Sequence, residues 1–139
     1  MKQVKKVMAY ITRDKDLLVF KHRDHPEAGI QVPAGTVDPG EAIEVALLRE
    51  IKEESGLEFT QPGRALGKFE WFSEFWQESQ LRYVFHLKAP GDTPQKWSHT
   101  VTGDAGARDL NLVFEYYWLP IAEAKTQLNG NRGEYLHLI

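Results

Sequence analysis

The sequence contains no cysteine in its 139 residues. This absence excludes disulfide bonds, thiolate metal sites and a cysteine nucleophile, so any metal ion must bind oxygen or imidazole ligands. Long apolar runs are also missing, because no stretch approaches the roughly 18 apolar residues of a membrane span. The basic N-terminus, residues 1–7, leads into a short alternating segment rather than the apolar core of a signal peptide. We therefore expect a cytoplasmic protein that has no membrane partner.

Strong charge of one sign is absent as well. The formal net charge of −3 offers no basic surface for a polyanion, which argues against duplex DNA or RNA as a partner. A small phosphorylated ligand is compatible with this charge, because local side chains or metal ions can supply positive charge. The length and the 42% hydrophobic content predict a single domain over residues 1–139 with one core. The sequence leaves a homodimer open.

The order of apolar segments predicts a mixture of strands and helices. The expected extended or strand segments are residues 7–11, 17–20, 31–33, 64–75, 80–88 and 112–119. A long helix is expected over residues 41–55, ended by Gly56, and a short one over residues 121–128. Residues 94–111 are expected to form a loop. This mixture predicts either an α+β fold or a three-layer α/β/α sandwich.

Three carboxylates share one face of the long predicted helix. Glu50, Glu53 and Glu54 stand at positions i, i+3 and i+4, which bring them together on a helix surface. Like charges at this spacing repel one another, and a hard divalent cation with oxygen ligands would reverse that repulsion. A solvated surface face is the alternative interpretation. The apolar residues Ile43 and Ala46 lie close to the glutamates, however, which favours a face that is covered.

The covering segment is expected to be the glycine-rich loop before the helix. Gly35 and Gly40 permit this loop to fold back tightly, so that its carbonyl oxygens can add metal ligands beside the carboxylates. Arg49 precedes Glu53 by one helical turn and is placed to pair with a carboxylate and hold it in orientation. An ordinary surface ion pair is the alternative for Arg49.

These residues form a recognisable motif. The chain follows the pattern Gly-x5-Glu-x7-Arg-Glu-U-x-Glu-Glu-x-Gly-U, with U an aliphatic residue, at Gly35, Glu41, Arg49, Glu50, Ile51, Glu53, Glu54, Gly56 and Leu57. This pattern is the Nudix box, and the chain therefore resembles the Nudix hydrolase family. A chance match to seven fixed residue types is on the order of one in a million or less. The resemblance covers residues 35–57 and implies the Nudix fold, a mixed β-sheet between helices.

The resemblance also implies a reaction. Members of this family hydrolyse a diphosphate linkage in nucleoside diphosphate derivatives, with Mg²⁺ as cofactor and Mn²⁺ as the alternative. The implied metal ligands are Glu50, Glu53 and Glu54, together with the loop at Gly35. Glu50 is the first candidate for the general base and Glu53 the second, while Arg49 and Glu41 are the implied orienting residues.

Two other functions are compatible with such a domain. One is a nucleotide-binding sensor or regulator without turnover, which the complete set of helix carboxylates argues against. The other is an isomerase that acts on a diphosphate-bearing isoprenoid, which the absence of cysteine argues against.

Outside the box, the candidate substrate contacts are His22, Arg23, Trp97, Arg108 and Glu115. Residues 95–111 are predicted to close over the substrate, because long irregular loops in compact domains often bind ligands. In that loop Trp97 offers a stacking surface, and Arg108 or His99 would meet phosphate oxygens. Glu115 is the first candidate for an additional acidic residue, with Asp104 and Asp109 after it. For each of these residues an ordinary surface or core role is the alternative.

Overall fold

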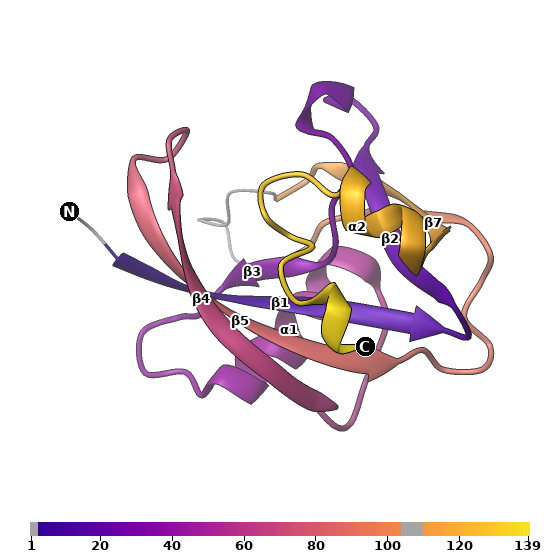
Figure 1. Cartoon of the computed structure of the whole chain (residues 1–139), viewed down its shortest axis with the longest axis horizontal. Helices are drawn as coiled ribbons and strands as arrows, with labels where there is room; N and C mark the ends of the chain where they lie inside the picture. Colours follow the sequence, from indigo (N-terminus) through magenta and orange to yellow (C-terminus); the bar gives the residue numbers. More distant parts are fainter. Residues whose placement is uncertain (1–2, 104–109) are drawn as a thin grey trace.

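The computed structural model of the chain describes residues 3–103 and 110–139 (Figure 1). Its strands are β1 (Gln3–Arg13), β2 (Asp16–His22), β3 (Ala34–Thr36), β4 (Arg64–Ser73), β5 (Glu78–Lys88), β6 (Trp97–Thr100) and β7 (Val113–Pro120). The helices are α1 (Ile43–Ser55) and α2 (Ile121–Gln127), with 3₁₀ turns at η1 (Pro26–Ala28) and η2 (Leu136–Leu138).

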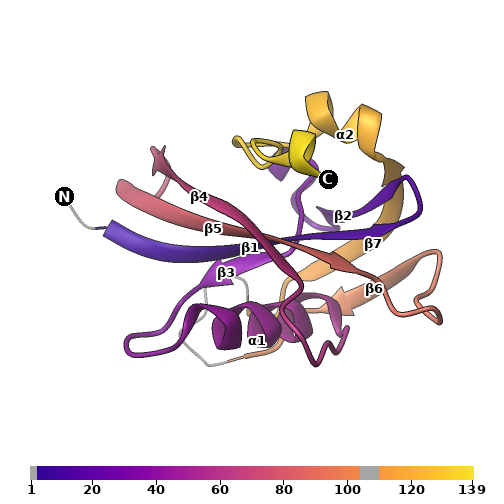
Figure 2. The same cartoon turned by 60° about the horizontal axis from the view of Figure 1, so that its bottom comes forward.

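All seven strands belong to one mixed sheet in the order β4-β5-β1-β2-β7-β6, and β3 pairs with β1 beside this path. Strand β1 runs parallel to β5 and antiparallel to β2 and β3. Figure 2 shows α1 on one side of the sheet, and α2 with the C-terminal segment on the other. The predicted α+β class and the mixed sheet between helices are confirmed.

The alternation of side chains along β1 divides the interior into two cores. Val7, Ala9 and Ile11 point toward α1 and pack with Leu47 and Ile51, all of them almost completely buried. The residues between them point to the opposite face, into a second core beneath α2. Burial of a Val, Leu or Ile side chain contributes roughly 1.5–3 kcal/mol, so these contacts hold α1 firmly on the sheet.

The long helix begins two residues later than predicted. Its first residue is Ile43 rather than Glu41, because Glu41 belongs to the preceding turn, where its N–H donates to the carbonyl oxygen of Asp38 at 3.0 Å. The predicted end is confirmed, since the helix stops at Ser55 and Gly56 adopts the left-handed conformation with φ of 81°.

The segment expected to be extended at residues 31–33 pairs with β2 through an isolated bridge between Gln31 and Phe20, and it leads into strand β3, which carries the start of the glycine-rich loop. One other prediction was wrong in part. The loop predicted over residues 94–111 contains strand β6, which pairs with β7. The four residues Trp, Ser, His and Thr are too few to indicate a strand in the sequence, and they form one because they pair with β7.

No helix in the described part of the chain is long and apolar enough to cross a membrane.

Candidate active site

The acidic face of α1 is partly buried at the edge of β3. Ala46, Leu47 and Ile51 anchor the helix on the sheet, and this orientation turns the adjacent face toward the loop that follows β3. The side chains of Glu50 and Glu53 are only 13% and 19% exposed. The face is therefore covered, as the neighbouring apolar residues predicted, and it is not an ordinary solvated helix surface.

The covering contact is made by Gly35. Strand β3 pairs with β1 so that Gly35 lies opposite Val7, and the carboxyl group of Glu50 rests against the α-carbon of Gly35. A Cβ atom at this position would lie 2.0 Å from both Cδ and Oε2 of Glu50. Only glycine leaves room for the Glu50 carboxylate where it stands.

Arg49 holds the other carboxylates together. Its Nε and Nη2 donate to the two carboxylate oxygens of Glu41 at 2.8 and 2.9 Å. Its Nη1 donates to Glu50 at 2.8 Å and to Glu53 at 3.0 Å, and Nη2 also donates to the carbonyl oxygen of Thr36 at 3.0 Å. The pairing of Arg49 with a carboxylate one turn away is confirmed. Such bidentate, charge-assisted bonds fix the orientation of the acidic groups.

The charge balance of this network is negative. Four carboxylates, those of Asp38, Glu41, Glu50 and Glu53, form ion pairs with the single guanidinium of Arg49. The pKa of this guanidinium is raised chiefly by its hydrogen bonds to Glu41. The same bonds lower the pKa of Glu41. Burial raises the pKa of Glu50 to about 7; the positive charge of Arg49 opposes this shift and the negative charge of Glu53 adds to it. The cluster therefore carries more negative than positive charge, and the pKa of Glu50 lies near neutral pH.

Glu54 has a bonding partner on β3. It is 4% exposed, and its Oε1 accepts a hydrogen bond from the backbone N–H of Ala34 at 3.0 Å. Within residues 3–103 and 110–139, no three acidic or histidine side chains stand close enough together to hold a metal ion as they are. The three helix carboxylates thus lie on one face but do not converge on one point.

The residues nevertheless fit a hard divalent cation. Glu50 and Glu53 already share one nitrogen of Arg49, so a cation at that point would meet oxygen atoms of both. The oxygen atoms that Arg49 bonds belong to carboxylates and to the carbonyl group of Thr36. Such oxygens are the ligand type that Mg²⁺ prefers. A divalent charge would also offset the excess negative charge of the cluster.

A family model for the NUDIX domain matches residues 2–139. The chain belongs to the NUDIX family.

Two curated relatives and one solved structure illustrate this relationship. An ADP-ribose pyrophosphatase of Methanocaldococcus jannaschii is 44% identical over 48 residues, 34% of this chain and 28% of that protein. The 8-oxo-dGDP phosphatase NUDT18 of Homo sapiens is 29% identical over 127 residues, 91% of this chain and 34% of that protein. The chain spans about a third of the length of these two proteins. A MutT NUDIX hydrolase from Burkholderia pseudomallei has the same fold, with a TM-score of 0.73, 22% identity, and coverage of 100% of this chain and 99% of that one.

The candidate residues outside the Nudix box have different positions. Glu115 lies between Phe114 and Tyr116, which point into the core beside α1, so alternation places it on the opposite face of the sheet. The structure therefore does not bring Glu115 to the box glutamates, because one residue along a strand changes the face. Asp104, Arg108 and Asp109 lie outside the described residues.

His22 is the last residue of β2 and Arg23 follows it, but the two side chains have different surroundings. The ring of His22 lies on the α1 side of the sheet, 4.6 Å from Phe114 and 5.9 Å from Phe20 between ring centroids. Arg23 is exposed and pairs with Asp24 at 3.1 Å. His22 thus lies on the same face of the sheet as the box helix, whereas Arg23 faces solvent.

Trp97 and His99 both bond the C-terminal end of α1. The indole of Trp97 stacks on Tyr116 with a centroid distance of 4.9 Å, and its Nε1 donates to the carbonyl oxygen of Ser55 at 2.9 Å. The Nε2 of His99 lies 2.9 Å from the carbonyl oxygen of Glu53. The predicted roles of these two side chains toward a substrate stay predictions, and in this structure both side chains bond the end of α1. The sequence did not indicate these contacts, because the partners are 42 and 46 residues apart.

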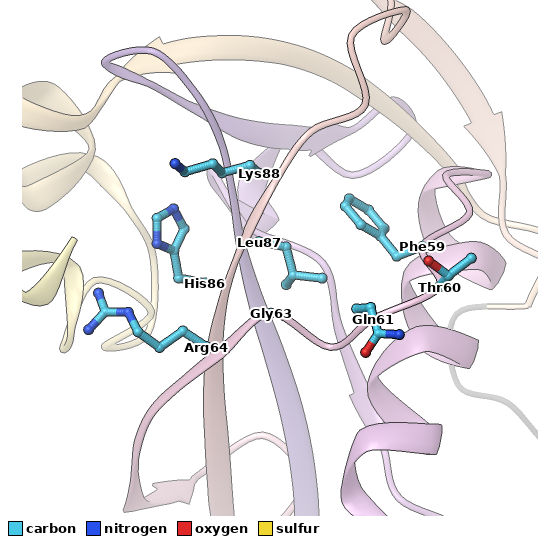
Figure 3. Close-up of a pocket in the computed structure, with 8 residues that line it drawn as sticks. All are labelled: Phe59, Thr60, Gln61, Gly63, Arg64, His86, Leu87 and Lys88. Carbon is cyan, nitrogen blue, oxygen red and sulfur yellow. The ribbon is translucent and has the colours of Figure 1, made fainter.

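Two surface cavities lie away from the carboxylates of the Nudix box. The cavity in Figure 3 has a volume of about 400 Å³ and is lined by Phe59, Thr60, Gln61, Gly63, Arg64, His86, Leu87 and Lys88. A second, of about 410 Å³, is lined by Lys21, Lys96, Trp97, Ser98, Glu115, Tyr116 and Tyr117. Neither is lined by a Nudix-box residue, so the chemistry of the box, and not the depth of a cavity, identifies the candidate site.

The close approach of Gly35 to Glu50 leads to a prediction for Gly35→Ala. The added methyl group is expected to displace the Glu50 carboxylate, because Cβ and the carboxyl group cannot occupy the same space. Turnover should fall between about 10- and 100-fold, as displacements of about 1 Å at reacting groups do. The melting temperature should change little, since the displaced group is the flexible end of a side chain. Gly91→Ala is the matched control, because nothing lies within 4 Å of its added Cβ. Equal turnover of Gly35→Ala and Gly91→Ala would contradict the proposed contact.

Proposed function

We propose that the protein is a metal-dependent hydrolase that cleaves the diphosphate linkage of a nucleoside diphosphate derivative. The observation that carries this proposal is the covered acidic face of α1, where Glu50 and Glu53 share Arg49 beneath Gly35. The two curated relatives, named ADP-ribose pyrophosphatase and 8-oxo-dGDP phosphatase, support it, because both names refer to nucleoside diphosphate compounds.

The metal ligands in this proposal are Glu50, Glu53 and Glu54, with the carbonyl oxygen of Gly35. The metal is Mg²⁺, and Mn²⁺ is the alternative, because all these ligands are hard oxygen donors. When bound, such an ion neutralises diphosphate oxygens and lowers the pKa of the attacking water. In this proposal Oε2 of Glu54 binds the metal, while Oε1 keeps the hydrogen bond from the N–H of Ala34.

Proton transfer is assigned to Glu50, with Glu53 as the second candidate. A general base works best when its pKa lies near the operating pH, and burial raises the pKa of Glu50 to about 7. Arg49 and Glu41 act as orienting residues, since Arg49 bonds both proton-acceptor candidates and is itself held by Glu41. His22, on the α1 side of the sheet, is the proposed contact for the substrate.

A substrate screen tests this function. The purified chain, with Mg²⁺, is incubated with ADP-ribose, nucleotide sugars, nucleoside di- and triphosphates, and dinucleoside polyphosphates, and the products are separated by ion-exchange chromatography. We expect at least one class to yield monophosphate products through cleavage between two phosphorus atoms. Binding of these nucleotides without any product would instead support a nucleotide sensor and would overturn the hydrolase proposal.

A further inference from the structure

The last turn of α1 is held by side chains from two distant strands. The final carbonyl groups of a helix have no partner within it, and they need donors from elsewhere when they are buried. Here the N–H of Gly56 bonds the carbonyl oxygen of Lys52. The next three carbonyl groups, of Glu53, Glu54 and Ser55, all accept bonds from side chains of β6 and β7.

The three donors are His99, Tyr116 and Trp97, each at 2.9 Å. The Nε2 of His99 bonds Glu53, the hydroxyl of Tyr116 bonds Glu54, and the Nε1 of Trp97 bonds Ser55. A carbonyl oxygen only accepts, so the Nε2 of His99 carries the hydrogen.

The three donors lie on two neighbouring strands of the sheet. Trp97 and His99 are two residues apart on β6 and therefore share a face, and Trp97 is paired with Tyr116 on β7. The rings of Trp97 and Tyr116 are stacked at an interplanar angle of 11°. The three donors thus lie on one hydrogen-bonded pair of strands, and they bond the helix end to β6 and β7 at three consecutive residues.

Two of the three capped residues, Glu53 and Glu54, carry carboxylates of the Nudix box. The carbonyl oxygen of Glu53 accepts a hydrogen bond from His99, and its carboxylate accepts one from Arg49. A shift of the Glu53 backbone would therefore move both the carbonyl group and the carboxylate. The N–H of Thr102 also bonds the carbonyl oxygen of Glu53 at 3.0 Å. A Cβ on Gly103 would lie 3.0 Å from the carboxyl carbon of Glu53. Contacts from the same segment therefore reach both the backbone and the carboxylate of Glu53.

Gly56 of the box has a second role in this arrangement. Its φ of 81° permits the helix to end, and a Cβ there would lie 3.1 Å from Nδ1 of His99. The glycine thus leaves space for the imidazole ring that caps Glu53.

We propose that His99 and Tyr116, supported by Trp97, are positioning residues that set the Glu53 and Glu54 carboxylates for metal binding. This inference rests on the proposed function. Partners that orient metal ligands typically change metal affinity by 10- to 100-fold when they are removed. A merely structural role would lower the stability of the helix end but leave the affinity of the folded protein for metal unchanged.

Mn²⁺ binding to the purified chain, followed by electron paramagnetic resonance without any substrate, separates the two roles. We expect Tyr116→Phe and His99→Leu each to weaken Mn²⁺ binding about 10-fold at a temperature where both are folded. Trp97→Phe should have a smaller effect, because Ser55 carries no carboxylate. His99→Gln should restore binding, since its amide nitrogen takes the place of Nε2.

Matched controls are available on the opposite face of the same strands. Tyr117→Phe removes the hydroxyl next in sequence to Tyr116, and Ser98→Ala changes the residue between Trp97 and His99. Both controls should bind Mn²⁺ as the wild type does. Circular dichroism and thermal melting test whether each variant is folded. If Tyr116→Phe does not fold, the positioning role is tested by comparing Mn²⁺ binding of His99→Leu with that of His99→Gln.

The outcomes distinguish this inference from the proposed function. If the wild type binds Mn²⁺ and Glu53→Gln weakens that binding, the metal site stands; unchanged affinity in folded His99→Leu and Tyr116→Phe would then overturn the positioning role alone. If the wild type binds no Mn²⁺, the proposed metal site and the positioning role are overturned together.

Discussion

Excess chelator is expected to abolish turnover, and added Mg²⁺ is expected to restore it. A diphosphate is multiply charged and repels an incoming anion, so its oxygens must be neutralised before water can attack. Arg49 contacts both Glu50 and Glu53, but it is also bound by Glu41, so its single charge is shared among several carboxylates. The measurement is the hydrolysis rate of a substrate from the screen, in excess EDTA and after MgCl₂ is returned.

A structural control accompanies this experiment. Both cores are built from apolar side chains of the sheet and helices, so the far-ultraviolet circular dichroism should be unchanged by the chelator. Loss of turnover with an unchanged spectrum would show that the metal is needed for the reaction and not for the fold. Equal rates with and without chelator would reject the metal mechanism.

Glu53→Gln and Glu50→Gln should each lower kcat by at least about 100-fold while the chain still folds. Each change removes a negative charge from the metal site or the proton acceptor itself, and removal of a general base typically costs 10²–10⁴-fold. The stability of Glu50→Gln should rise slightly in the metal-free protein, because burial already disfavours the ionised form of Glu50.

The matched control for both variants is Glu44→Gln. Glu44 is exposed in the first turn of the same helix and lies outside the cluster, so its kcat should stay within about twofold of the wild type. Kinetics are measured at saturating Mg²⁺, with thermal melting of each variant. Turnover near the wild-type value in both cluster variants would show that this helix face has no role in the reaction.

The helix and its motif were predictable because the signals are local. Glu50, Glu53 and Glu54 share a face by helical periodicity alone, and Gly56 ends the helix through its own backbone conformation. The pairing of Arg49 with Glu53 is also a contact between adjacent turns. The close packing of Gly35 on Glu50, by contrast, was only anticipated as a folded-back loop, since its distance depends on the pairing of β3 with β1.

Sequence by itself determined the family, the acidic helix and the residues of the Nudix box, because each depends on residue types at fixed short spacings. Only the tertiary structure decided that Glu54 turns to Ala34, that Glu115 faces away from the box, and that His99 caps Glu53. These arrangements depend on strand register, in which a shift of one residue exchanges the two faces of the sheet. Between strands far apart in the chain, register depends on how both strands pack together, so the short local patterns of the sequence did not reveal these contacts.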